Sequence, residues 1–87
     1  MSAMSAETMN YVDYKKSSRT TIRLSIGDVY LRRKGNGWTR EIVNYGWVDG
    51  HLYLNYVEYL NDKTKPHAGC CSVYALLKWG KKIEVTP

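Results

Sequence analysis

Residues 27–60 read GDVYLRRKGNGWTREIVNYGWVDGHLYLNYVEYL, and this stretch decides the fold. Two turn signals, Asn36-Gly37 and Asp49-Gly50, separate three runs of β-branched and aromatic residues. Asn-Gly and Asp-Gly supply the positive φ angles that tight hairpin turns require. The stretch therefore predicts a three-stranded antiparallel meander. It contains no catalytic or cofactor motif.

The preceding run, residues 20–26, is the clearest single strand. Ile22 and Leu24 alternate there with polar residues, which indicates one buried face and one solvated face. The alternation resumes in residues 29–33, with Val29 and Leu31 on one side, so we expect a sharp bend between the two runs.

The two later runs of the meander carry apolar residues on both faces. In residues 38–48 this pattern predicts a strongly bent central strand, or a bulge near Ile42 or Gly46. Residues 51–60 show the same two-sided character. Strands covered on both faces imply a closed or nearly closed sheet.

The period changes after residue 72. Ser72 is a suitable N-cap, residues 73–79 have apolar positions at helical spacing, and Gly80 is a suitable stop. We expect a short helix over 73–79, followed by a last strand near residues 83–85.

These elements predict a mainly β fold, a small antiparallel five- or six-stranded barrel with one short C-terminal helix. We assign residues 1–19 to a flexible N-terminal segment, in which residues 11–14 are a candidate edge strand. Residues 20–87 form the barrel domain.

The aromatic residues are eight Tyr and three Trp, with no Phe among 87 residues. Each Tyr and Trp carries a polar group that needs a partner or water, so many of these rings should be half-exposed. Such rings suit the thin wall of a small barrel and equally a binding face.

The formal charge of +5 favours an acidic partner, either nucleic acid or an acidic protein surface. No apolar run approaches the roughly 20 residues of a membrane span, and the first residues lack signal-peptide features. Cys70 and Cys71 are adjacent, so a disulfide scaffold is not expected. We expect a cytoplasmic protein with no membrane partner.

Two other groupings of reactive side chains are incomplete. His67, Cys70 and Cys71 resemble half of a zinc site, but only His51 is left as a fourth ligand. Cys71 with His51 or His67 has no motif of nucleophilic catalysis around it. We predict no metal and no cofactor, with Cys70 or Cys71 as a small core residue and His67 as a solvated loop side chain.

Enzymatic chemistry has no further support. Glu41 and Glu58 lie on neighbouring predicted strands, where surface glutamates opposite Lys or Arg are commoner than a catalytic pair. The run Lys34-Gly35-Asn36-Gly37 lacks the strand-to-helix setting of a phosphate loop and is better explained as a hairpin tip. We therefore predict a non-enzymatic binding module.

The layout resembles small Tudor-like or Src-homology-three-like barrel proteins, including uncharacterised phage and prophage proteins. The resemblance lies in residues 27–30, 39–43, 50–59 and 76–82, and extends over roughly residues 22–85 by pattern. It implies a module that binds protein or nucleic acid, and phage members can inhibit host defence. It assigns no functional residue.

Our first hypothesis is that a basic and aromatic surface engages a polyanion, nucleic acid above all. Its candidate residues are Arg32, Arg33, Lys34, Trp38, Lys78, Lys81 and Lys82. The same cations also suit a solvated surface that protects sheet edges.

The alternative is a phage-encoded inhibitor, anti-CRISPR-like or otherwise directed against defence, that binds a bacterial protein in the host cytoplasm. Tyr and Trp are typical of interface hot spots. Its candidate anchors are Tyr45, Trp47, Tyr53 and Tyr56.

Overall fold

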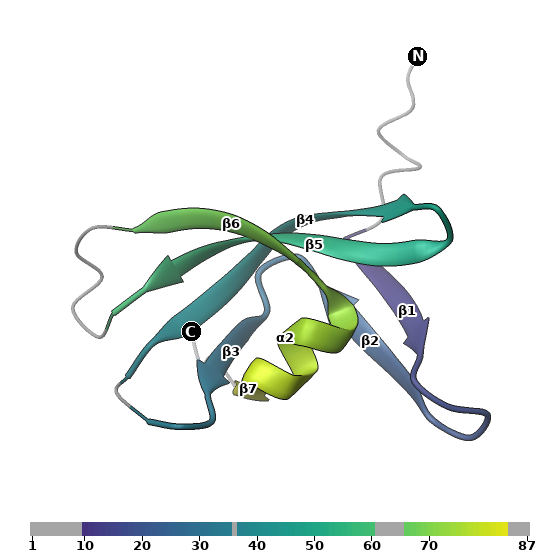
Figure 1. Ribbon diagram of the computed structural model, residues 1–87, viewed down its shortest axis with the longest axis horizontal. Helices are drawn as coiled ribbons and strands as arrows, with labels where there is room; N and C mark the ends of the chain where they lie inside the picture. Colours follow the sequence, from purple (N-terminus) through teal and green to yellow (C-terminus); the bar gives the residue numbers. More distant parts are fainter. Residues whose placement is uncertain (1–9, 36, 61–65, 84–87) are drawn as a thin grey trace, which may run out of the picture.

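The computed structural model describes residues 10–35, 37–60 and 66–83. Its strands form two antiparallel sheets, one of β1 and β2, the other in the order β6-β5-β4-β3-β7 (Figure 1). No helix among the described residues is long and apolar enough to cross a membrane. The elements are β1 (Tyr11–Lys15), β2 (Thr21–Ser25), β3 (Val29–Arg32), β4 (Thr39–Val48), β5 (His51–Tyr59), β6 (His67–Ser72), α2 (Val73–Trp79) and β7 (Gly80–Ile83).

The β4–β5 hairpin is the longest part of the larger sheet. Asp49 and Gly50 turn the chain with φ angles of 50° and 79°, as the Asp-Gly signal predicts. The register shifts between Ile42 and Asn44, which confirms a bulge near Ile42. Because of that extra residue, Ile42 and Tyr45 lie on the same face although they are three positions apart, opposite Tyr56 and Leu54. Val43, between them, is exposed.

The core gathers side chains from both sheets and from the helix. It consists of Leu24, Tyr30, Ile42, Leu52, Leu54, Val73 and Leu76. Within β3, the structure buries Tyr30 and leaves Val29 and Leu31 only half-buried, so the other face of this strand points to the core. The large apolar body of tyrosine suits it to this position.

Helix α2 occupies 73–79, as predicted. The Ser72 hydroxyl accepts a hydrogen bond from the Ala75 amide at 3.1 Å, which caps the N-terminus. Val73 and Leu76 are buried, and the helix lies against β5, β6 and β7 (Figure 1). It thereby links the two outer strands of the sheet, β6 and β7.

The predicted closed barrel is wrong. In the described residues β6 and β7 are the two edges of an open five-stranded sheet, and β1 and β2 pair only with each other. The two-sided apolar pattern of residues 38–60 was misleading because Val43, Val48 and Tyr53 are exposed. The core face of the sheet is covered by α2 and the β1–β2 pair.

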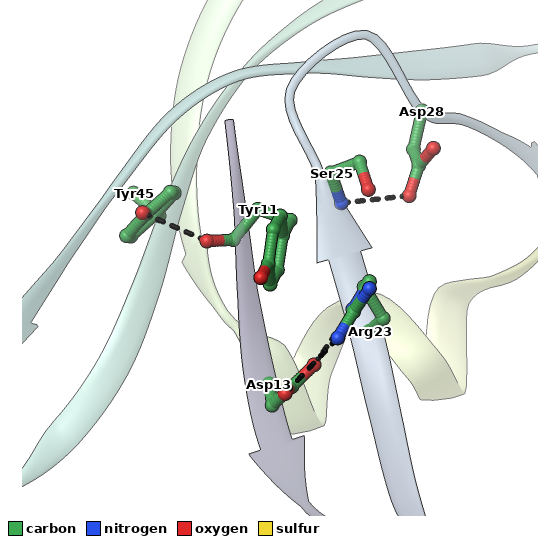
Figure 2. Close-up of polar contacts among 6 residues, drawn as sticks. All are labelled: Tyr11, Asp13, Arg23, Ser25, Asp28 and Tyr45. Carbon is green, nitrogen blue, oxygen red and sulfur yellow. Dashed lines mark hydrogen bonds and ion pairs between the residues drawn. The ribbon is translucent and has the colours of Figure 1, made fainter. Parts of the chain in front are cut away.

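Residues 11–15, which the sequence analysis placed outside the domain, form β1 in register with the whole of β2. Arg23 on β2 pairs with Asp13 on β1, with 3.0 Å between Nε and Oδ1 (Figure 2). At the corner that leads to β3, the Asp28 carboxylate accepts a hydrogen bond from the Ser25 amide at 2.8 Å. Residues 1–9 lie outside the described part of the chain.

Candidate functional site

A groove runs between β1, α2 and the end of the β4–β5 hairpin. Its first hollow, of about 550 Å³, is lined by Tyr14, Trp47, Gly50, His51, Leu52, Tyr53, Ser72, Val73 and Tyr74. Its second, of about 250 Å³, is lined by Tyr14, Lys16, Tyr74, Leu77 and Lys78. Tyr14 and Tyr74 belong to both linings, so the two hollows adjoin. We call them together the aromatic groove.

The rings of this groove are unusually open to solvent. Trp47 is 58% exposed and Tyr74 is 64% exposed. Trp47 and Tyr53 were both predicted from sequence as protein-binding anchors, and both line the first hollow. Trp47 pairs opposite Leu52 and Tyr53 opposite Gly46, so their side chains leave the sheet on different faces, and Trp47 is the one on the groove side with Leu52. Exposed rings gathered in a hollow are characteristic of a binding surface.

Tyr74 was not predicted as a binding residue, although the helical pattern of residues 73–79 indicates that it is exposed. Val73 and Leu76 form the buried side of α2, which leaves Tyr74 and Lys78 on the opposite side. An aromatic residue on the polar side of an amphipathic helix is the pattern that would have revealed it.

The wall opposite α2 comes from β1, which contributes Tyr14. This strand is tied to the larger sheet by Tyr45, whose hydroxyl donates to the Tyr11 carbonyl at 3.0 Å (Figure 2). Tyr45 was also predicted as an anchor for a partner protein. The structure instead places its half-buried ring between β4 and β1.

Two lysines lie at the helix side and the β1 side of the second hollow. The Lys78 Nζ is 5.2 Å from the centroid of the Tyr74 ring, and Lys16 lines the same hollow. The described residues that line the two hollows include no Asp or Glu. The groove therefore combines flat apolar rings with positive charge.

The basic residues predicted around the first hairpin and after α2 are brought to neighbouring strands, β3 and β7, but not all to one face of the sheet. Strands β3 and β7 pair with Arg32 opposite Gly80 and Leu31 opposite Lys81. Since neighbouring residues of a strand point to opposite faces, Arg32 and Lys81 serve different sides of the sheet. With the described residues, Arg32, Lys34 and Lys81 form no ion pair.

Besides Lys78, four of the predicted binding residues have contacts within the chain, namely Arg32, Arg33, Trp38 and Lys82. The Arg33 guanidinium donates to the Leu77 carbonyl, with Nη2 at 3.1 Å, and so stabilises the C-terminal end of α2. Lys82 Nζ lies 3.5 Å from Asp28 Oδ1. The Trp38 carbonyl accepts the Arg32 amide at 2.9 Å, which holds the hairpin together.

A second cluster of rings and charge lies on the core face of the sheet. The Arg40 guanidinium lies over the Tyr56 ring at 4.2 Å and over the Trp79 ring at 4.1 Å. Its Nε is 2.7 Å from Glu58 Oε1, and the two side chains are only 16% and 25% exposed. Tyr56, predicted as an anchor, belongs to this cluster. We call these four residues the Arg40 cluster.

Burial is the main influence on the pKa values of Tyr56 and Cys71, which both lie near Arg40. It raises the pKa of the Tyr56 hydroxyl, and Arg40 opposes the shift. It also raises the pKa of the Cys71 thiol, again opposed by Arg40, whose Nη1 is 3.9 Å from the sulfur. Both groups are therefore neutral at physiological pH.

The other reactive groups considered from sequence are not brought together. Glu58 shares a face with its partner Arg40, whereas Glu41 is one position away and points to the other face. Cys70 and Cys71 are adjacent on β6, so their side chains also point to opposite faces of the sheet. In the described part of the chain no three His, Cys, Asp or Glu residues form a group that could hold a metal ion.

The aromatic groove is thus the surface best suited to a ligand. Its rings offer faces for stacking and its lysines offer charge. His51 also lines it, whereas Cys70, Cys71 and His67, the residues considered together with His51, line neither hollow. Comparison with known protein families, with curated proteins and with solved structures finds no match for this chain.

Proposed function

We propose that this chain is a non-enzymatic module that binds nucleic acid in the aromatic groove. The observation that supports this most is the lining of one groove by Tyr14, Trp47 and Tyr74 and by two lysines, with no carboxylate among its described residues. Nucleic-acid binding requires cations for phosphates, and it gains further affinity from aromatic faces against bases. The net charge of +5 acts in the same direction.

Arg32, Arg33 and Lys34 have a secondary role in this proposal, because they lie outside the groove. Arg33 reaches the Leu77 carbonyl, and Leu77 also lines the second hollow beside Lys78. The basic end of the sheet therefore adjoins the groove and extends its positive surface. The basic end of the sheet would then contribute positive charge, and the groove would contribute the contacts between rings and bases.

Salt dependence tests the proposal directly. Fluorescence anisotropy with labelled DNA and RNA should give a dissociation constant that rises steeply between low and physiological salt, because bound lysines release counterions from phosphates. Lys78→Gln should weaken binding and lower the slope of log K against log salt by about one. No binding to either nucleic acid at low salt would contradict the proposal.

Lys81→Gln is the matched control for Lys78→Gln. It removes the same charge from β7, where Lys81 pairs opposite Leu31 and lines neither hollow. The proposal expects the smaller effect from this variant. Equal losses in the two variants would favour a diffuse basic surface over the groove.

A protein partner is the second candidate, and it includes the inhibitor of a bacterial host or defence protein. Its support is Trp47, which is 58% exposed near the end of β4, because exposed tryptophans are frequent hot spots. Pull-down from nuclease-treated bacterial lysate tests it. A partner retained by Val43→Ala but lost by Trp47→Ala would favour this role, and no such partner would exclude it.

A further inference from the structure

We infer that the aromatic groove takes single-stranded nucleic acid, with unpaired bases against its rings and phosphates beside Lys16 and Lys78. This rests on the proposed function and names the class of ligand. On this inference the rings, and not the lysines, determine the preference for single strands over duplexes.

The first step is the availability of ring faces. Trp47 and Tyr74 are more than half exposed, and both line a hollow of about 550 Å³. That volume lies within the roughly 300–1,000 Å³ typical of sites for small organic ligands. An unpaired base is a flat aromatic body that can stack in such a site, whatever its sequence.

The second step is the position of the charges. The two hollows share Tyr14 and Tyr74, so a base in the first hollow has the lysines of the second beside it. Lys78 is already close to the Tyr74 ring, at 5.2 Å from its centroid. A chain of alternating bases and phosphates therefore matches the succession of rings and lysines along the groove.

The third step is the poor fit of a duplex. Paired bases are stacked on their neighbours, so their faces are not available to side chains. Reading a duplex through base edges requires a helix or ribbon that projects polar groups into a groove of the nucleic acid. On α2 the exposed residues are Tyr74, Ala75 and Lys78, which provide one cation and no amide for such contacts. A duplex would therefore engage only the lysines.

Competition binding tests the inference. The probe is a labelled oligothymidine of about 10 nucleotides, within the range of known single-strand sites. Its competitors are the unlabelled oligomer, an abasic oligomer with the same phosphates, and a duplex of the same length. We expect the abasic chain and the duplex to bind at least about tenfold more weakly, because each stacked base contributes about one factor of ten or more.

Variants locate the selectivity. Trp47→Ala and, separately, Tyr74→Ala should weaken oligothymidine binding by about tenfold and weaken abasic binding by a clearly smaller factor. Both side chains are mostly exposed, so the variants should keep the circular dichroism spectrum of the parent chain. Val43→Ala is the control, since this exposed residue lines neither hollow.

The outcomes separate the two proposals. If no nucleic acid binds at low salt, the proposed function itself fails. If the abasic chain or the duplex binds as tightly as the oligothymidine, nucleic-acid binding stands and the single-strand inference is overturned. If both ring variants bind like the parent chain, the aromatic groove is not the site.

Discussion

The Arg40 cluster and the aromatic groove are built from the same kinds of side chain and differ in whether those side chains are already satisfied. Arg40 is enclosed by two rings and pairs with Glu58 at 2.7 Å. In the groove, Tyr74 has Lys78 near one part of its ring and is still 64% exposed. Rings and cations that are buried against one another stabilise the fold. Exposed rings and cations remain available to contact a ligand.

The difference also lies in the backbone that carries each cluster. Arg40, Tyr56 and Glu58 stand on paired central strands, where the ladder fixes them opposite one another. The groove is assembled from elements that do not pair, a strand of the smaller sheet and the helix. A site between unpaired elements keeps room for a further molecule.

Replacing Arg40 should produce the largest effect. Arg40→Leu leaves Glu58 half-buried without its cation and removes two ring contacts, so we expect unfolding to become easier by about 2 kcal/mol. For a chain of this size that corresponds to a fall of roughly 10 °C in Tm, measured by circular dichroism.

Arg23→Leu is the matched control for this change. Arg23 also pairs with a carboxylate and lies over a ring, that of Tyr11 at 3.9 Å, but the two charged side chains are 58% and 48% exposed. We expect its Tm to stay close to that of the parent chain. Equal losses for Arg40 and Arg23 would show that enclosure is not what distinguishes the Arg40 cluster.

The next effect concerns Gly69, which lies under the Tyr56 ring. A Cβ at this position would be 2.6 Å from Cζ of that ring, so Gly69→Ala must displace the Tyr56 ring from its position beside Arg40. We expect a loss of about 1–2 kcal/mol by overpacking, read from urea unfolding.

Gly46→Ala provides the comparison within β4. No atom lies within 4 Å of the added Cβ, so this change should leave stability unchanged or raise it by about 0.5 kcal/mol. If Gly69→Ala were as well tolerated, the Tyr56 ring would not be held as tightly as the contacts around Arg40 indicate.

The smallest effect concerns the wall of the groove. Tyr45→Phe removes the hydrogen bond to the Tyr11 carbonyl that ties β1, and hence Tyr14, to the larger sheet. We expect oligothymidine binding to weaken about fivefold, since a hydrogen bond of this kind contributes about 1 kcal/mol.

A double-mutant cycle tells whether Tyr45 acts through Tyr14. Combined with Tyr14→Ala, the Tyr45→Phe change should have little further effect on affinity. Additive losses would contradict the positioning role. Amide hydrogen exchange in β1, faster in Tyr45→Phe, gives a readout that needs no ligand.

Local features of this fold were predictable from sequence because they depend on near neighbours. The Asp49-Gly50 turn, the helix after Ser72 and the bulge near Ile42 all follow from turn chemistry, capping and period. Whether the sheet closes into a barrel could not be predicted from near neighbours. Apolar residues on both faces of residues 38–60 read equally well as a barrel wall and as a sheet with one exposed apolar face.

The candidate site was only half predictable for a related reason. Trp47, Tyr53 and Lys78 were chosen from sequence, but Tyr14 and Lys16 belong to a segment that looked too short and too interrupted to fold. The role of Arg40 depends on the strand register, which places Glu58 opposite it, and on the packing of α2, which brings the Trp79 ring to it. No periodicity in the sequence reveals such pairings across elements.

The pairing of β1 with β2 has a practical consequence for anyone who shortens this chain. A fragment that began at residue 20, the boundary suggested by sequence, would keep every strand of the larger sheet. It would also lose Tyr14 and Lys16 and leave β2 without its neighbour. Such a fragment, even if it folded, could not be used to test binding in the aromatic groove.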